Sequence, residues 1–368
     1  MTMLTAIRGA RATLTALGRR RHLTTASSRI QAANTAELST ALDARASYAA
    51  LAGRSVISVA GVDALAFLQG MQCNDMARAL GGGMFTGFLA PQGRMVADAF
   101  LYAAANDSFL VEVDARVSER VLKALQFYRL RAKVVIRDAS AEHAIWSVWG
   151  PDTPSISEAG AAAGAVDSRA PQMGLRLVMS ADRSPSLPAH FDERSGGEAQ
   201  LRRILKGVAE GADDFLPSVA VPLECNLDYM GGVHFSKGCY VGQELTIRTH
   251  HRGVVRKRLV PLLLGPMTSP LCADIDASPM GVAPSADVVC VRADDAPRPR
   301  RALAPGRLGS VAGNAALALL RIDDVASYQV GAVSFDAVAA DGSRVLAMPW
   351  IPAWWPQAGQ SPATAAAA

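Results

Sequence analysis

Cysteine is scarce in this sequence, and the few that occur are scattered. There are five, and no two form a Cys-x-x-Cys pair: Cys73, Cys225, Cys239, Cys272 and Cys290. An odd number of widely spaced thiols predicts neither a disulfide framework nor a self-contained zinc site. Such cysteine usage is typical of a protein of a reducing compartment.

Charged residues and long apolar runs are also few. Charged side chains make up 19% of the 368 residues and hydrophobic ones 50%, which predicts a globular chain rather than a disordered one. No apolar run approaches the roughly 20 residues that span a bilayer, so we expect no membrane insertion. The motifs Gly-x-Ser-x-Gly and His-Glu-x-x-His and the Walker loop are missing. Since no basic face interleaved with aromatics occurs after residue 36, we expect no nucleic-acid partner.

Acidic residues are absent from the first 36 positions. This segment holds six arginines, no lysine and many threonines and serines, and the first acid is Glu37. Subtracting its six positive charges from the total of +4 leaves a net charge of −2 on the rest of the chain. Such a composition is typical of an organellar transit peptide. We therefore predict that residues 1–36 are a mitochondrial transit peptide and that the mature protein lies in the matrix.

The length of the chain predicts two or three domains, and residues 37–258 alternate irregularly between strand and helix patterns. A β-hairpin is predicted at 84–102, and a helix that Asp114 caps is predicted at 115–128. Residues 152–168 are rich in Ala, Gly, Ser and Pro and predict a loop or a variable helix, at a subdomain junction near 150–170. Because no glycine-rich phosphate loop follows a strand, an antiparallel α+β arrangement is favoured over a doubly wound nucleotide-binding fold.

The C-terminal region, residues 259–356, has a β-rich pattern. Short strands are predicted at 260–264, 288–292, 308–311, 316–322 and 330–335, which indicates a small β-barrel-like domain. A range rich in Pro, Ala, Asp and Arg, 273–306, is predicted to be a loop insertion, and 357–368 a disordered tail. Three tryptophans near the end are predicted to pack the terminus rather than bind a ligand: Trp350, Trp354 and Trp355.

The stretch that points most directly to chemistry reads Lys237-Gly238-Cys239-Tyr240-Val241-Gly242-Gln243-Glu244. Its glycines permit a tight loop, and a short helix is predicted after it, so Cys239 is expected near the first turn of that helix. Exposed N–H groups at a helix start and the nearby Lys237 would favour the thiolate, which binds soft metals and attacks electrophiles. The local pattern leaves a second interpretation open, in which Cys239 is a small buried apolar residue and Lys237 is merely solvated.

This octapeptide resembles the signature of the YgfZ-type, T-protein-related family of folate-binding-like proteins. The preceding residues 221–228, with Glu224 and Cys225, are similar to the lead-in of that signature. Residues 61–75, 85–102, 128–134 and 309–321 also resemble stretches of the family, so the similarity covers most of 50–330 outside 273–306. The resemblance implies an α+β folate-binding-like scaffold, with antiparallel sheets and helices around a central funnel, followed by a C-terminal barrel.

The resemblance also implies a function. Family members with a mitochondrial leader are associated with a late step of [4Fe–4S] cluster maturation, beside A-type carrier proteins. We therefore expect an assembly factor rather than an enzyme, acting as a monomer or in a transient heterocomplex. Cys239 would be a ligand or transient thiol partner of an iron–sulfur cluster shared with another protein, because one thiolate cannot hold such a cluster alone.

Tetrahydrofolate is the cofactor that the resemblance implies. Glu224 matches the position from which T-proteins direct an acid toward the pterin, and Asp98 stands in the hairpin where they use an acidic pair. Three arginines are candidate cations for the glutamate tail: Arg94, Arg129 and Arg131. The other position of the acidic pair is Ala97, so transferase chemistry would depend on Asp98 alone. Two alternatives remain, a tetrahydrofolate-dependent aminomethyl or one-carbon transferase and a folate-binding module without a metal role.

Overall fold

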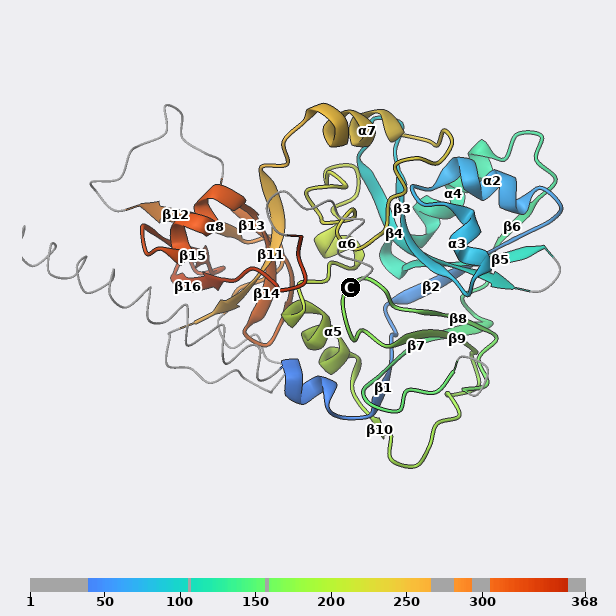
Figure 1. Cartoon of the computed structure of the whole chain (residues 1–368), viewed down its shortest axis with the longest axis horizontal. Helices are drawn as coiled ribbons and strands as arrows, with labels where there is room; N and C mark the ends of the chain where they lie inside the picture. Colours follow the sequence, from blue (N-terminus) through green and yellow to red (C-terminus); the bar gives the residue numbers. More distant parts are fainter. Residues whose placement is uncertain (1–38, 105–106, 156–158, 266–280, 293–304, 357–368) are drawn as a thin grey trace, which may run out of the picture.

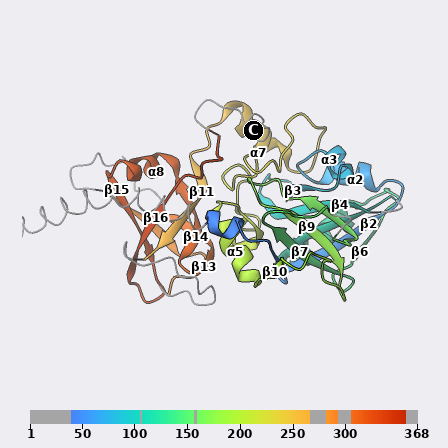
Figure 2. The same cartoon turned by 60° about the horizontal axis from the view of Figure 1, so that its bottom comes forward.

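The computed structural model describes residues 39–104, 107–155, 159–265, 281–292 and 305–356. The predicted transit peptide, the predicted tail and Cys272 lie outside these residues. Two five-stranded sheets and a closed barrel make up the described part (Figure 1). The barrel stands beside the two sheets, and helix α5 (Gly196–Leu205) lies between them (Figure 2). No helix in the described part has both the length and the apolar character needed to cross a bilayer.

The first sheet, here called the hairpin sheet, is antiparallel throughout. Its strands in spatial order are β3 (Met84–Leu89), β4 (Met95–Ala104), β5 (Ser108–Asp114), β2 (Arg54–Ala60) and β6 (Val135–Asp138). One face is covered by α2 (Ala64–Met71), α3 (Met76–Leu80), the 3-10 turn η1 (Ala115–Val117) and α4 (Ser118–Tyr128). The predicted hairpin is confirmed, and so is the cap, because the Asp114 carboxylate accepts a hydrogen bond from Arg116 N at 2.8 Å.

The second sheet faces the uncovered side of the hairpin sheet. Its order is β10 (Asp192–Glu193), β1 (Ser47–Ala50), β7 (His143–Trp149), β9 (Leu175–Ser180) and β8 (Ala163–Val166). Apolar side chains from both sheets share one core, with Phe100 and Tyr102 on one side and Ile145 and Val178 on the other. Residues 150–170, where we expected a subdomain junction and a loop or helix, instead contain β8 and lie between β7 and β9 of the same sheet. The chain passes between the two sheets at 51–53 and again at 139–142.

The barrel closes because its last strand pairs with its first. The strand order is β11 (Lys257–Leu264), β14 (Ala315–Arg321), β13 (Gly306–Ala312), β12 (Asp287–Arg292), β15 (Val333–Val338) and β16 (Arg344–Pro349), and β16 pairs with β11. The predicted β-barrel-like domain is confirmed. Helix α8 (Ile322–Gln329), which we did not predict, occupies residues between two predicted strands.

The range 273–306, predicted as a loop insertion, contains a barrel strand. Strand β12 pairs with β13 on one side and with β15 on the other. The sequence predicts both a strand at 288–292 and a loop over 273–306, and the structure agrees with the strand. The loop prediction rests on composition, because the sequence on both sides of the strand is rich in proline and arginine. The prediction of a loop throughout 273–306 is therefore wrong.

The last described residues fold back onto the two-sheet body. Trp354 Nε1 donates a hydrogen bond to Lys206 O at 2.7 Å, and the Trp355 ring packs edge-on against Tyr229 at a centroid distance of 5.4 Å. The prediction that these tryptophans pack the terminus is confirmed. They tie the end of the barrel to the segment after α5, so the barrel and the body share one core.

Candidate functional site

The octapeptide 237–244 ends in a helix start that only glycine permits. Helix α7 (Gln243–Arg252) follows Gly242, which has a left-handed φ of 76°. A Cβ on Gly242 would lie 2.2 Å from Ala90 O in the turn between β3 and β4, and a Cβ on Gly93 in that turn would lie 2.6 Å from Leu245 Cβ. The hairpin turn and the start of α7 therefore interlock, which fixes the position of the loop that precedes α7.

Lys237 anchors the front of this loop to α2. Its Nζ donates hydrogen bonds to Gln69 O at 2.6 Å and to Gln72 O at 2.7 Å, at the end of α2 where carbonyl groups lack helical partners. Burial lowers the pKa of Lys237 to about 8, against the opposing effect of Cys73. We expected the Lys237 ammonium to act on the Cys239 sulfur, but its described partners are these two carbonyls and the Tyr240 ring, whose centroid lies 4.9 Å from Nζ.

Tyr240, Val241 and Gln243 anchor the back of the loop. The Tyr240 side chain is buried, and Val241 N donates to Gly70 O at 3.0 Å. The Gln243 side chain accepts a hydrogen bond from Tyr240 N at 3.3 Å. Glu244 is 89% exposed and pairs loosely with Arg248, one turn along α7, at 3.7 Å. The loop is thus held on both sides of Gly238 and Cys239.

Cys239 projects from this anchored loop into solvent. Of the four cysteines within the described residues, Cys239 alone is exposed, while Cys73 and Cys225 are buried and Cys290 is partly buried. Burial raises the pKa of Cys73 to about 12 and that of Cys290 to about 11. The alternative interpretation of Cys239 as a buried apolar residue is wrong. It is the described thiol that a partner could reach.

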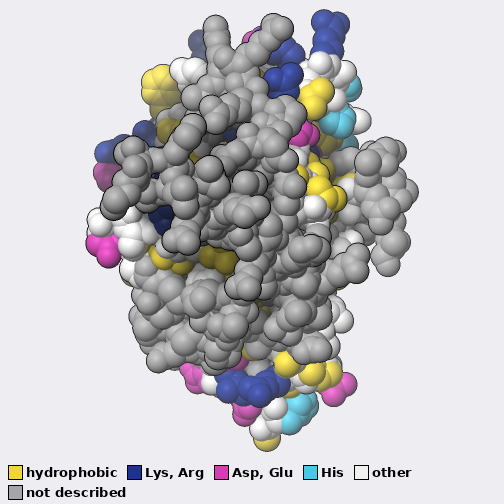
Figure 3. Space-filling view, turned by 90° about the vertical axis from the view of Figure 1, so that its left-hand side faces the viewer, with side chains coloured by type: hydrophobic (Ala, Val, Ile, Leu, Met, Phe, Trp, Pro, Cys, Tyr) yellow, Lys and Arg dark blue, Asp and Glu magenta, His cyan; other side chains and the backbone are white. Residues whose placement is uncertain are grey.

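The part of the chain that the structure describes does not form a complete metal site around Cys239. Within the described residues, no group of three or more His, Cys, Asp or Glu side chains is arranged to hold a metal ion. His250 on α7 stacks on Phe235 with a centroid distance of 3.6 Å, and burial lowers its pKa. Lys, Arg and His side chains are visible near the upper edge of Figure 3, the level at which Figure 1 places α7. A cluster bound at Cys239 would need its other ligands from outside the described part of this chain.

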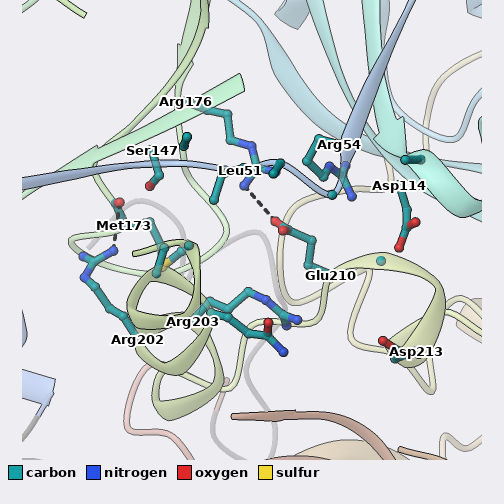
Figure 4. A pocket seen from close by; sticks show the side chains of 18 of the residues that line it. Leu51, Arg54, Asp114, Ser147, Met173, Arg176, Arg202, Arg203, Glu210 and Asp213 are labelled. Carbon is teal, nitrogen blue, oxygen red and sulfur yellow. Dashed lines mark hydrogen bonds and ion pairs between the residues drawn. The ribbon is translucent and has the colours of Figure 1, made fainter. Parts of the chain in front are cut away.

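A second candidate site is a cavity of about 510 Å³ between the two sheets and α5 (Figure 4). Its charged lining residues are Arg54, Asp114, Arg116, Arg169, Arg176, Arg202, Arg203, Glu210 and Asp213. All six arginines of this lining already pair with carboxylates of the chain. The lining is therefore rich in guanidinium groups whose charges are largely compensated.

A buried network of charges forms one wall of this cavity. Arg176 on β9 binds Glu112 on β5 through Nη2 at 2.5 Å and Glu210 through Nη1 at 2.7 Å, and Arg169 also binds Glu210 at 2.7 Å. Burial opposes the charged form of Glu210, but Arg176 and Arg169 outweigh it and hold its pKa well below the ordinary value. The network joins the two sheets through paired charges, which the sequence analysis did not predict. The signal was an arginine inside the apolar strand sequence Leu-Arg-Leu-Val-Met.

Asp98, the predicted acid of the hairpin, lies behind this wall. It is 1% exposed, and its carboxylate accepts a hydrogen bond from Gly211 N at 3.0 Å and pairs with Arg54 Nη1 at 3.3 Å. Burial raises its pKa, while Arg54 opposes that rise. Asp98 is therefore already bonded within the chain, and Ala97 beside it is buried and apolar.

The other residues predicted to bind folate lie apart from both described cavities, the one above and a second of about 790 Å³. Arg94 is exposed and donates to Val219 O at 2.9 Å. Arg129 and Arg131 are exposed in the turn after α4, and Glu224 is partly buried in the segment before the loop. None of these four is a lining residue of either cavity. Their role in folate binding stays a prediction.

One lining residue of the first cavity, Arg54, has a hydrogen-bond donor without a partner among the described residues. Arg54 Nη2 is buried and has no hydrogen-bond partner among the described residues, although the other nitrogens of Arg54 bind Asp98 and Glu112. A buried, unpaired guanidinium N–H is costly unless an acceptor meets it. The cavity thus fits a molecule with acceptor oxygens or nitrogens, and tetrahydrofolate carries both. Arg202 and Arg203 also line this cavity, but their guanidinium groups already bond to carboxylates of the chain.

Comparisons with known proteins define the class first. Residues 29–176 match the family described as GCVT N-terminal domain, and residues 256–357 match CAF17, C-terminal beta-barrel domain. The fold is similar to glycine cleavage system aminomethyltransferase T from Bartonella henselae, with a TM-score of 0.57 over 86% of this chain and 89% of that chain. At 13% identity this likeness shows the fold alone. The chain is a protein of the T-protein scaffold with a closed C-terminal barrel.

Sequence relatives then define the family. The protein from Mycosarcoma maydis named iron–sulfur cluster assembly factor IBA57 homolog, mitochondrial, is 37% identical over 340 residues, which cover 82% of this chain and 83% of that protein. A protein of the same name from Neosartorya fischeri is 37% identical, with 76% and 71% covered. The chain belongs to the IBA57 family of iron–sulfur cluster assembly factors. The family resemblance, the T-protein-like scaffold and the mitochondrial location predicted from the sequence are confirmed.

Proposed function

We propose that this protein is a mitochondrial assembly factor for late-stage [4Fe–4S] maturation, in which Cys239 is a cluster ligand or transient thiol partner. The observation that carries this proposal is the exposure of Cys239 on a loop anchored at Lys237 and Val241. A thiol held in one place by buried neighbours costs little further ordering when a partner binds it. The names of its relatives support iron–sulfur clusters as the cargo.

The partner must contribute most of the cluster ligands. Iron–sulfur clusters are held mainly by four thiolates, and the described residues offer one exposed thiol. We propose that an A-type carrier protein supplies further thiolates, so that the cluster is shared between two chains for the duration of the transfer.

The test is the visible absorption of an anaerobic mixture of this protein with a [2Fe–2S]-loaded A-type carrier. We expect a new shared-cluster spectrum with the native protein and none with Cys239→Ser. Cys290→Ser, which alters a partly buried barrel thiol, is the matched control and should behave like the native protein. If the Cys239→Ser mixture gives the native spectrum, direct ligation by Cys239 is excluded.

A second candidate function is folate binding in the cavity between the sheets, supported by the unpaired Arg54 Nη2 and by the arginine-rich lining. Bound tetrahydrofolate would supply a one-carbon or aminomethyl acceptor, whereas this chain would bind and orient it. Because Asp98 is engaged by Arg54 and Gly211, we favour binding over transfer. Calorimetric titration with tetrahydrofolate should show binding that weakens in Arg54→Lys, which keeps one charge and removes Nη2. No heat of binding with the native protein would exclude this function, and formation of methylene-tetrahydrofolate would restore the transferase alternative.

A further inference from the structure

Four exposed apolar side chains gather around the start of α2 and the end of α4. Val62 is 73% exposed, Leu65 41%, Phe127 74% and Leu130 84%. Both helices pack on the covered face of the hairpin sheet, and Lys133 N in the turn after α4 bonds the Asp63 carboxylate that precedes α2 (Figure 1). We call these four residues the α2–α4 patch. Exposed apolar side chains that cluster, unlike single ones, mark interaction surfaces.

The backbone under the patch is locked in place. Lys133 N donates a hydrogen bond to the Asp63 carboxylate at 2.7 Å, and a Cβ on Gly61 would lie 2.2 Å from Lys133 O. The turn after α4 therefore packs directly against the residues that precede α2. This contact brings Leu130, three positions before Lys133, toward Val62.

Leucine is an unfavourable residue for the backbone conformation and the solvent exposure found at position 130. Its φ is +45°, in the left-handed region that glycine and asparagine adopt more readily than leucine. Its side chain contributes almost nothing to the core, because it is 84% exposed. A residue that is strained in backbone and unburied in side chain has no folding role that accounts for it, and an apolar partner would supply the missing burial.

The rim of the patch is basic. Arg129, Arg131 and Lys133 are exposed, and no ion pair is described for any of them. Two of these are the arginines that the sequence suggested for a folate tail. Basic groups around an apolar centre match a partner face that is apolar at its centre and acidic at its edge.

The patch lies one short helix away from the Cys239 loop. Helix α2 has eight residues, which at 1.5 Å per residue make it about 12 Å long. Its second residue, Leu65, belongs to the patch, and the carbonyls at its end hold Lys237 and Val241. A standard protein interface covers about 800 Å² on each partner, enough to include both the patch and Cys239.

We propose that the α2–α4 patch docks the acidic, apolar face of the cluster-carrying protein and so presents its cluster to Cys239. This proposal rests on the assembly function proposed above and names the surface that brings the partner to the thiol. A protein fits better than a lipid surface, because polybasic lipid-binding segments carry four to eight basic residues and the rim has three. In addition, α4 turns its own apolar face, with Val121 and Leu125, into the core.

The test measures the affinity of the full chain for a [2Fe–2S]-loaded A-type carrier by titration calorimetry. The double variant Phe127→Gln/Leu130→Asn removes the apolar centre, and asparagine tolerates the left-handed backbone at 130. The double variant Arg129→Glu/Arg131→Glu reverses the rim. We expect each to weaken binding about tenfold or more, with an unchanged thermal midpoint, and the charge reversal to lose its effect at high salt. Val330→Gln and Arg307→Glu, exposed residues of the barrel region, should bind within about twofold of native.

The outcomes separate docking from ligation. Cys239→Ser should dock with near-native affinity and fail to form the shared cluster, which supports both proposals. Native affinity in both patch variants overturns the docking proposal and leaves Cys239 untouched. If the native protein binds the carrier but gives no shared-cluster spectrum, ligation by Cys239 is excluded. The affinities of the two patch variants then decide the docking proposal. If the native protein instead sediments with phosphatidylserine vesicles, and the patch variants do not, the patch is a lipid surface and the docking proposal is wrong.

Discussion

The buried network around Arg176 and the loop around Cys239 both contain polar groups held by distant parts of the chain. They differ in how many of these groups have a partner within the chain. In the network nearly every charge meets an opposite charge, and only Arg54 Nη2 is left unpaired. In the loop, the polar anchors Lys237 and Val241 are satisfied by α2, and the thiol between them has no described partner group for a metal. The network joins the two sheets through paired charges, whereas the contacts of the loop hold one thiol exposed to solvent.

The largest effect should come from breaking the network. Arg176→Met leaves Glu112 and Glu210 short of a counter-charge, and we expect a loss of about 3–5 kcal/mol in the free energy of unfolding by urea at pH 7. Arg137→Met, which breaks a solvent-exposed ion pair with Glu142, is the matched control and should leave the free energy of unfolding close to native.

The stability difference between the native protein and Arg176→Met should depend on pH. The folded-state pKa of Glu210 is lowered, so its contribution to stability is present above the ordinary pKa of about 4.3 and is lost as the pH falls through the lowered value. Removing Arg176 weakens that shift, and the stability gap between native and Arg176→Met should narrow in acid. A gap that stays constant from pH 7 to pH 3.5 would show that the charges of this network are not what stabilises it.

A smaller effect is expected where the loop meets the hairpin turn. Gly242→Ala forces alanine into a left-handed backbone and sets its Cβ against Ala90 O, which we expect to cost about 1–3 kcal/mol. Amide hydrogen exchange at residues 238–241 should accelerate, because the anchor of the loop shifts. Gly238→Ala is the matched control, since a Cβ there meets nothing within 4 Å, and it should change stability by about 0.5 kcal/mol or less. Equal behaviour of the two variants would contradict the interlock.

The smallest effect should come from the front anchor. Lys237→Met removes two hydrogen bonds to the end of α2 and should cost about 1–2 kcal/mol at pH 7. Burial lowers the folded pKa of Lys237 to about 8, so between there and about 10.4 the unfolded chain binds its proton more tightly. The free energy of unfolding of the native protein should therefore contain a contribution that increases with pH between about 8 and about 10.4. Lys237→Met should lack this contribution. Lys123→Met, at an exposed lysine, should keep the native pH profile.

Much of the fold could be predicted from local pattern. The hairpin 84–102 and the helix after Asp114 were found because alternation and capping are properties of neighbouring residues. Strand β8 was missed because Ala163–Val166 is short and lies in a range whose composition resembles a loop. Helix α3 was not predicted for a similar reason, because five residues are too few to show a helical periodicity.

The candidate site divides in the same way. Cys239 could be singled out because glycines, a lysine and the octapeptide signature stand together in the sequence. The cavity could not, because Arg54, Glu112 and Arg176 are far apart along the chain. They meet only when β2 pairs with β5 and the sheet that contains β9 packs against them. The folate arginines were chosen by their place in a motif, and none of them lines a described cavity.

The sequence by itself determined the family, the scaffold, the terminal barrel and the residue on which the proposed chemistry depends, because each is written in contiguous residues. The tertiary structure decided what those residues do. It bonded Lys237 to the carbonyls at the end of α2, engaged Asp98 with Arg54, and left Leu130 exposed. Hydrogen bonds and charges act over a few ångströms, so their partners are set by which segments the fold brings together and not by which residues are adjacent in the chain.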